Sequence, residues 1–245
     1  MNILIVNDDG IESEGIKILA RALTPHGKLY VAAPANEQSG KSQSISLKQT
    51  LKIENTDLIP GTMRTIKVYG SPADAVRAGL SLFNVEFDLV VSGINNGANI
   101  AKDILYSGTV GSAKEAKIYG INAIAFSADN LDLDYLYDET IKTIDEIIEN
   151  KLYEFDGILN VNFPRFTFEK PKGVIFTKQG ERYYHSEFIK KTSSENEYYL
   201  KGSITNFNED EDTDVWAYNN GYISITPLTL DNTNYKILRK LTNNL

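Results

Sequence analysis

The chain of 245 residues contains no Cys, two His, and 25 basic against 33 acidic side chains, giving a formal net charge of −8. The absence of thiols excludes disulfides, thiolate zinc sites and a Cys nucleophile. With only His26 and His185 available, a three-His metal site is excluded and a Ser-His-Asp triad would depend on one of them. The acidic balance argues against a protein that binds nucleic-acid polymers through a basic face. A bound metal has to be held mainly by oxygen, which suits hard divalent cations.

The chain begins with a short apolar run followed by two Asp residues. A secretory signal needs a basic start and a longer apolar stretch. No run reaches the roughly 18 apolar residues that a membrane-spanning helix requires. We therefore expect a cytoplasmic protein with no membrane partner.

Short apolar runs alternate with helical patterns through the first two-thirds of the chain. The patterns predict strands at 2–7, 29–33, 66–69, 88–92, 123–127 and 158–161, and helices at 16–23, 72–82, 108–119 and 135–148. The second helix has clear start signals: Ser71 as N-cap, Pro72 at the first helical position and Asp74 in the first turn. Repeated alternation of this kind predicts an α/β fold, a three-layer Rossmann-like and mostly parallel sheet.

The pattern changes after Pro164. Strands rich in aromatic and β-branched residues are predicted at 173–178, 183–189, 198–201 and 222–226, with no helix until 235–241. We therefore divide the chain into an α/β catalytic core over 1–164 and a second part over 165–245. This second part is predicted to consist of a β-hairpin extension over 165–230 and a C-terminal arm.

Polar side chains follow three of the predicted core strands. Asp8 and Asp9 end the first, Ser39 lies in the loop after the second, and Asn95 follows the strand at 88–92. Ligands of open α/β sheets bind beyond the carboxyl ends of the strands, so these side chains should share one edge. Two neighbouring carboxylates with hydroxyl and amide oxygens suit Mg²⁺, Mn²⁺ or Ca²⁺. The alternative is that Asp8-Asp9-Gly10 is only a tight turn with a helix cap.

A run of small residues stands where the helix at 108–119 begins. Ser107, Gly108 and Thr109 would let backbone N–H groups approach an anion, which the helix dipole also favours. The alternative is an ordinary N-cap by Ser107 or Thr109, and both interpretations are compatible. Neither a dinucleotide fingerprint nor a P-loop is present. A metal site beside an anion site indicates a phosphorylated ligand.

Six segments of the chain together resemble the survival protein SurE family. The match spans nearly the whole chain, and its blocks SGINNGAN and YSGTV are the most specific. Members of this family are 5′/3′-nucleotidases that remove phosphate from nucleoside monophosphates. The segments are MNILIVNDDGIESEG (1–15), PANEQSGKSQSIS (34–46), GSPADAV (70–76), DLVVSGINNGANIAKDILYSGTV (88–110), NVNFP (160–164) and DTDVWAYNNGYISITPL (212–228).

The resemblance implies one divalent cation per subunit, Mg²⁺ or Mn²⁺, and places the phosphate against Asn99 and the turn Ser107-Gly108-Thr109. It also implies exopolyphosphatase activity in many members, and homodimers or homotetramers with an exchanged C-terminal arm. Ala101 and Ser13 stand where the family commonly has Gly and Ala, which leaves the substrate preference open. The implied metal ligands are Asp8, Asp9, Ser39 and Asn95.

The expected reaction is metal-assisted hydrolysis of a phosphate monoester. Asp8 or Asp9 is the candidate base for the attacking water, and Ser107 with the amides of Gly108 and Thr109 would stabilise the phosphoryl oxygens. A covalent aspartyl-phosphate is the rival route. Two other protein classes remain open: an aspartyl-phosphate phosphatase or receiver-like domain, and a nucleotide sensor without catalysis.

Overall fold

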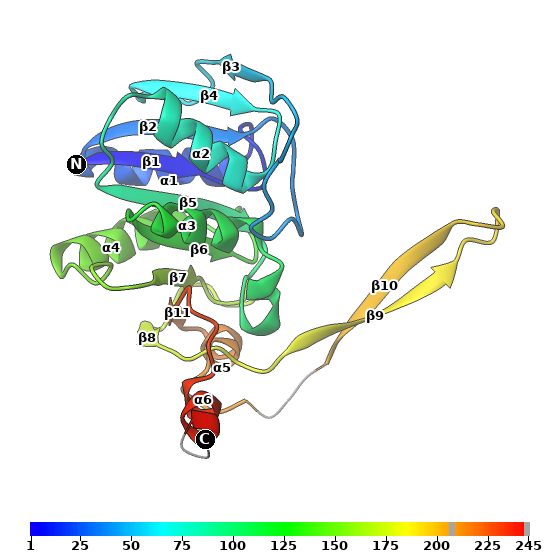
Figure 1. The fold of residues 1–245 in the computed structure, drawn as a ribbon. Helices are drawn as coiled ribbons and strands as arrows, with labels where there is room; N and C mark the ends of the chain where they lie inside the picture. The colour runs from blue at the N-terminus through cyan, green and yellow to red at the C-terminus, as the bar shows by residue number, and fades with distance from the viewer. Residues whose placement is uncertain (206–208, 243–245) are drawn as a thin grey trace.

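A computed structural model describes residues 1–205 and 209–242. Within these residues, nine strands form one sheet in the order β3-β4-β2-β1-β5-β6-β7-β11-β8 (Figure 1). The strands of the sheet are β1 (Asn2–Val6), β2 (Lys28–Pro34), β3 (Ile53–Asn55), β4 (Arg64–Val68), β5 (Leu89–Asn96), β6 (Asn122–Ala128), β7 (Ile158–Asn162), β8 (Val174–Phe176) and β11 (Ile223–Leu228).

The central strands are parallel and buried on both faces, which is why their sequences are apolar almost without interruption. Alternate residues of β1 show how the two faces are used. Ile3 and Ile5 pack in the apolar cluster on one face, and Leu4 and Val6 in the cluster on the other. All four side chains are fully buried, and each contributes on the order of 1.5–3 kcal/mol.

Helices cover both faces of the sheet (Figure 1). The helices α1 and α4 contribute to the first apolar cluster and α2 and α3 to the second, so the predicted three-layer α/β architecture is confirmed. The helices are α1 (Glu14–Leu23), η1 (Thr24–His26), α2 (Pro72–Leu82), η2 (Ala101–Leu105), α3 (Gly108–Ile118), α4 (Leu136–Glu149), α5 (Asp214–Asn220) and α6 (Tyr235–Thr242).

The start of α2 follows its sequence signals. The Ser71 hydroxyl accepts from the Asp74 N–H at 3.1 Å, and the Asp74 carboxylate accepts from the Ser71 N–H at 2.9 Å. This reciprocal pair is a capping box, with Pro72 at the first helical position. The carboxylate of Asp74 also accepts from the N–H and the hydroxyl of Ser46, at 2.9 and 2.7 Å. The capping box therefore also fixes the long loop that follows β2.

The sheet continues beyond residue 164, which corrects the interpretation of 165–230 as a hairpin extension. β11 pairs antiparallel with β7, and β8 pairs parallel with β11. The physical reason is that the outer edge of β7 needs a partner, and Ile223 and Ile225 of β11 are buried in the main apolar cluster. The predicted hairpin is limited to β9 (Tyr183–Lys190) and β10 (Tyr198–Thr205), which project away from the body (Figure 1).

The helix α5 is absent from the sequence-based prediction. Its sequence DVWAYNN is short and rich in weak helix formers. Two local features define its ends: the Thr213 hydroxyl accepts from the Trp216 N–H at 3.2 Å, and Gly221 ends the helix with a φ of 88°.

In the described part of the chain, no helix combines the length and apolar character needed to cross a membrane.

Candidate active site

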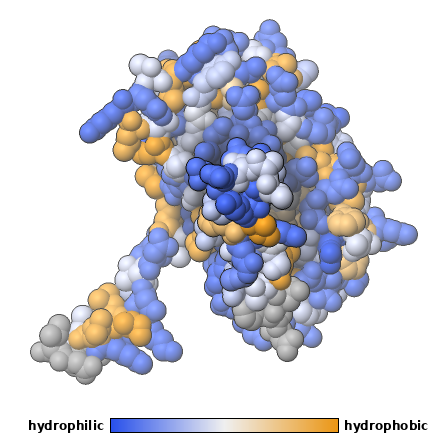
Figure 2. Space-filling model, turned by 90° about the vertical axis from the view of Figure 1, so that its right-hand side faces the viewer, coloured by the Kyte–Doolittle hydropathy of each residue, from blue (hydrophilic) through white to orange (hydrophobic). Residues whose placement is uncertain are grey.

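The carboxyl ends of β1, β2 and β5 meet at one edge of the sheet, as the sequence predicts (Figure 1). Two hydrogen bonds join the loops there. The N–H of Gln38 donates to the carbonyl of Asp8 at 2.7 Å, and the N–H of Asn96 donates to Oδ2 of Asp9 at 2.9 Å. The loop that carries Ser39 and the end of β5 that carries Asn95 are therefore both attached to the Asp8-Asp9 segment. Figure 2 looks onto this face, where hydrophilic residues predominate.

Asp8 is the most buried of the predicted ligands, with 3% of its surface exposed. Its Oδ1 atom accepts a hydrogen bond from the Thr109 hydroxyl. Burial raises the pKa of Asp8 to about 6, and the neighbouring charge of Asp9 adds to this effect, while the bond from Thr109 opposes it. The hydrogen bond from Thr109 therefore does not fully offset the cost of burying the charged carboxylate of Asp8.

Asp9 lies beside it and is less buried. Burial raises its pKa, the bond from the Asn96 N–H lowers it, and the negative charge of Glu37 raises it further. When both Asp8 and Asp9 are charged, they repel each other, and few hydrogen-bond donors surround them. A divalent cation would offset both the repulsion and the cost of burial, because it supplies opposite charge to the two carboxylates together.

The two neutral candidate ligands lie on the loop after β2 and at the end of β5. The side-chain NH₂ of Asn95 donates to the Gly97 carbonyl at 2.6 Å, which leaves the amide oxygen as the group available to a cation. The Ser39 hydroxyl donates to Glu37 Oε1 at 2.7 Å and keeps oxygen lone pairs for another partner. Both side chains can therefore act as oxygen ligands without breaking their present bonds.

The start of α3 touches Asp8. A Cβ atom added to Gly108 would lie 2.8 Å from both Cβ and Oδ2 of Asp8, so only glycine allows this approach. Ser107 is the N-cap, and its hydroxyl accepts from the Val110 N–H at 3.1 Å. The predicted N-cap is confirmed, and the hydroxyl hydrogen of Ser107 remains available for an anion. The donors of Thr109 are already used, because both its hydroxyl and its N–H donate to Asp8.

Asn99 lies in a buried amide network that sequence reasoning did not identify. Its NH₂ group donates to the Ser127 hydroxyl at 2.8 Å, and its N–H donates to Asn162 Oδ1 at 2.7 Å. Its carbonyl accepts from the side chains of Asn160 and Asn162 at 2.8 and 3.1 Å. The network fixes the loop after β5 on β6 and β7, and the polar pair in the run NVNFP was the signal for it.

The residues present fit a hard divalent cation. Residues 1–205 and 209–242 contain no group of three or more His, Cys, Asp or Glu side chains that could hold a metal. The donors that the sequence predicts at this edge are the two carboxylates, the amide oxygen of Asn95 and the hydroxyl of Ser39. A ligand set of low charge, made only of oxygen, favours Mg²⁺ or Mn²⁺ with retained waters.

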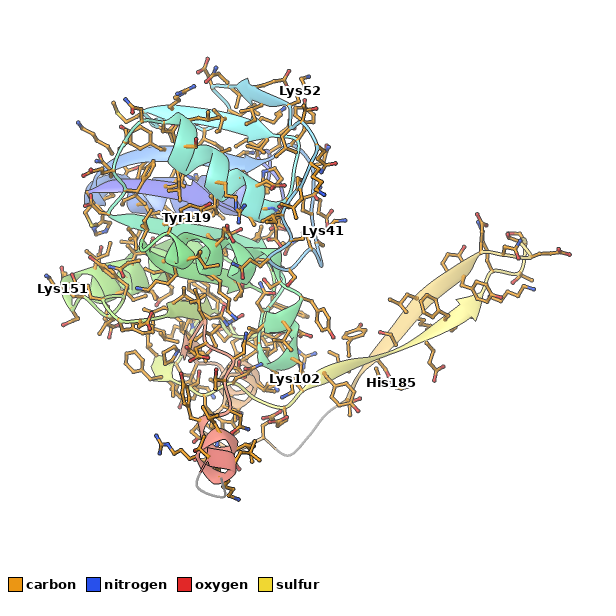
Figure 3. All side chains as sticks on the ribbon, viewed as in Figure 1. Lys41, Lys52, Lys102, Tyr119, Lys151 and His185 are labelled. Atoms are coloured by element: carbon orange, nitrogen blue, oxygen red, sulfur yellow. The ribbon has the colours of Figure 1, made fainter. Side chains whose placement is uncertain are left out.

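Neither His residue belongs to the site. His26 lies in the last turn of η1, and its Nε2 lies 2.9 Å from Asp145 Oδ1 on α4. His185 lies on the projecting hairpin, away from the sheet edge (Figure 3). A Ser-His-Asp triad is thereby excluded at this edge.

A family model described as survival protein SurE matches residues 3–186. The chain belongs to this family. A relative from Clostridium beijerinckii, named 5′-nucleotidase SurE, is 36% identical over 252 residues, covering 99% of this chain and 98% of the relative. A protein of the same name from Aquifex aeolicus is 39% identical, covering 97% of this chain and 96% of its own length.

A solved structure has the same fold. The crystal structure of the SurE protein from Aquifex aeolicus aligns with a TM-score of 0.81 and 37% sequence identity, covering 99% of both chains. The α/β architecture described above is therefore the SurE architecture, and the match includes the part of the chain after residue 164.

Proposed function

We propose that this protein is a divalent-metal-dependent phosphatase that hydrolyses nucleoside 5′- and 3′-monophosphates to nucleoside and phosphate. One observation carries the proposal: the buried carboxylate of Asp8 lies against Gly108, at the positive N-terminal end of α3. This contact supports a cation site and an anion site side by side. The relatives named 5′-nucleotidase SurE support the substrate class.

The chain's own residues supply most of the chemistry. Asp8, Asp9, Ser39 and Asn95 would hold the cation. When bound, it would neutralise charge that develops on the phosphoryl group. At the start of α3, the hydroxyl of Ser107 and the N–H of Gly108 would donate hydrogen bonds to the phosphoryl oxygens. Thr109 would keep Asp8 in place. Asn99 would contact the phosphate from its position in the buried amide network.

Either Asp8 or Asp9 would accept the proton of the attacking water, and a covalent aspartyl-phosphate is the rival route. The stereochemistry at phosphorus separates the two. A thiophosphate analogue of AMP whose phosphorus is made chiral with oxygen isotopes should give inverted product if water attacks directly. Retained configuration would show two successive displacements through an aspartyl-phosphate.

The central test is release of phosphate from AMP in the presence of Mn²⁺ or Mg²⁺. We expect the variant Asp9→Asn to lose this activity, because it removes one of the two carboxylates. The matched control is Asp138→Asn on the exposed face of α4, which should leave the rate unchanged. Nucleotide binding without phosphate release, with either metal, would refute the phosphatase and favour the sensor.

The cofactor proposal has its own measurement. Titration calorimetry with Mn²⁺ should give one site per chain in the wild type and a much weaker site in Asn95→Ala. Exopolyphosphatase activity, which the resemblance implies, is measured by phosphate release from polyphosphate chains under the same conditions. The cytoplasmic location expected from the sequence stays a prediction.

We also propose that the β9–β10 hairpin and residues 231–245 join subunits into a homodimer or homotetramer. Support comes from large apolar side chains exposed in the single chain, which normally indicates an interaction surface. Light scattering of the whole chain and of a chain ending at residue 230 tests the role of the arm, because the truncated chain should form smaller assemblies. The exposed side chains include Phe188, Tyr199, Leu200, Ile237, Leu238 and Leu241.

A further inference from the structure

A cavity of about 510 Å³ adjoins the candidate active site. Its walls come from the loop after β2, at 35–49, and from the end of β4 with the turn into α2, at 68–71. The same loop contributes Gln38, whose N–H donates to the carbonyl of Asp8 at 2.7 Å. The cavity and the candidate metal site therefore share a wall, and the volume lies within the roughly 300–1,000 Å³ typical of small-molecule sites.

The loop that forms this wall is fixed from several sides. Ser46 is bonded to Asp74 at the start of α2. Ser42 donates through its N–H to Tyr106 at 2.9 Å and through its hydroxyl to Leu105 at 2.8 Å. These bonds tie the loop to the start of α2 and to the end of η2, shortly before α3 begins. The cavity is thus a built feature of the fold and not a gap beside a loose loop.

The chemistry of the lining indicates a neutral, polar ligand. Among the described residues that line the cavity, side-chain amides and hydroxyls predominate, and Lys41 carries the one charge. Figure 3 shows Lys41 at the edge of the sheet where the strands end. A polyphosphate chain would require several cations along its length. A nucleoside instead presents donors and acceptors that match the side chains of Asn36, Gln38 and Gln49.

Tyr69 supplies a ring for a base. It lines the cavity and is 40% exposed. Its hydroxyl donates to Glu54 Oε2 at 2.7 Å, and Lys52 Nζ lies 4.7 Å from its ring centroid. Lys52 and Glu54 are outside the lining, and their contacts fix the position of the ring. A fixed aromatic ring in a cavity wall is suited to stacking against a nucleobase.

We infer that this cavity binds the nucleoside half of the substrate, with the base stacked on Tyr69 and the side-chain amides contacting its edge. The inference rests on the proposed function for the position of the phosphate. It assigns binding of the leaving nucleoside to β4 and the loop after β2, while the phosphate is held by α3.

The test compares two substrates that differ only in the base, AMP and ribose 5-phosphate. We expect Tyr69→Ala to raise KM for AMP by roughly tenfold, the loss typical of one base stack, and to leave KM for ribose 5-phosphate unchanged. Tyr69→Phe keeps the ring and should retain the wild-type KM for AMP. The matched control is Tyr119→Ala, because Tyr119 is also exposed and also lies beside a cation, with Arg77 Cζ 6.0 Å from its centroid.

Direct binding of adenosine, measured by calorimetry, tests the cavity independently of catalysis. Tyr69→Ala should weaken adenosine binding by roughly tenfold and Tyr119→Ala should not change it. Equal effects of Tyr69→Ala on AMP and ribose 5-phosphate, or no adenosine binding by the wild-type protein, overturn the inference. If the wild type binds adenosine through Tyr69 but releases no phosphate from any nucleotide, the proposed function fails and the nucleoside site stands.

Discussion

The Asp74 carboxylate offers a quantitative test of how the loop beside the site is held. It is 4% exposed and accepts three bonds outside its own residue, from the N–H and hydroxyl of Ser46 and the N–H of Ser71. Burial raises its pKa, but these bonds lower it more strongly, so the pKa of Asp74 lies below its ordinary value. The charged form is therefore the one that stabilises the fold.

The substitution Asp74→Asn keeps the shape and removes the charge. The amide oxygen can still accept from the Ser46 N–H, but an NH₂ group in place of Oδ2 leaves the Ser71 N–H without an acceptor. A buried donor without a partner costs about 1–3 kcal/mol, and the remaining bonds lose their charge assistance. We expect Asp74→Asn to lower the free energy of unfolding by about 3 kcal/mol at pH 7.

Urea unfolding at a series of pH values checks both the size and the sign. A carboxyl group with a lowered pKa contributes stability above its unfolded pKa and loses it as the pH falls through its folded pKa. The difference between wild type and Asp74→Asn should therefore be constant from pH 7 down to about 5 and shrink below about 4. A difference under 1 kcal/mol at pH 7, or one that grows in acid, would refute this reasoning.

Four further outcomes follow from the geometry. Gly108→Ala should lower kcat/KM for AMP more than tenfold, because the added methyl collides with Asp8, while circular dichroism shows an intact fold; wild-type kinetics would contradict the close approach. Ser71→Ala should cost about 1 kcal/mol in urea unfolding, the usual value of an N-cap, and no change would contradict the capping role. Arg77→Met leaves the Glu115 carboxylate, 2% exposed, without the guanidinium 2.6 Å away; because Arg77 is itself partly exposed, about 2 kcal/mol should be lost in the same assay. Saturating Mn²⁺ at 100 times its Kd should stabilise the protein by about 2.7 kcal/mol in thermal unfolding, and EDTA should reverse this; an unchanged Tm would argue against a metal site.

The sequence predicts best those features whose signals are local. The start of α2 is an example, because Ser71, Pro72 and Asp74 lie within one turn and each has one physical task. The meeting of Asp8, Asp9 and Asn95 at one edge is also predictable, because parallel strands place their carboxyl ends together. The ends of the elements differ by a few residues, and β5 runs on to Asn96 with irregular pairing to β6 after Ser92.

Features that depend on distant parts of the chain were not predictable. β3 has three residues and little apolar character, so only its pairing with β4 makes it a strand. The exchange of hydrogen bonds between Asn99 and the Asn side chains of β7 joins residues about sixty positions apart. The contact of Thr109 with Asp8 is similar, because a local pattern identifies a helix start but not which carboxylate it will meet.

The strand order gives the candidate site a property that does not depend on its side chains. β1 lies between β2 and β5, and the chain leaves β1 through α1 on one face but leaves β5 toward α3 on the other. The two loops must therefore separate as they leave the sheet, which is the topological switch point of an α/β fold. The place of the site in the fold is therefore set by connectivity. Substitutions at Asp8, Asn95 or Gly108 can remove the chemistry, yet they leave the switch point, where another set of polar residues could bind another ligand.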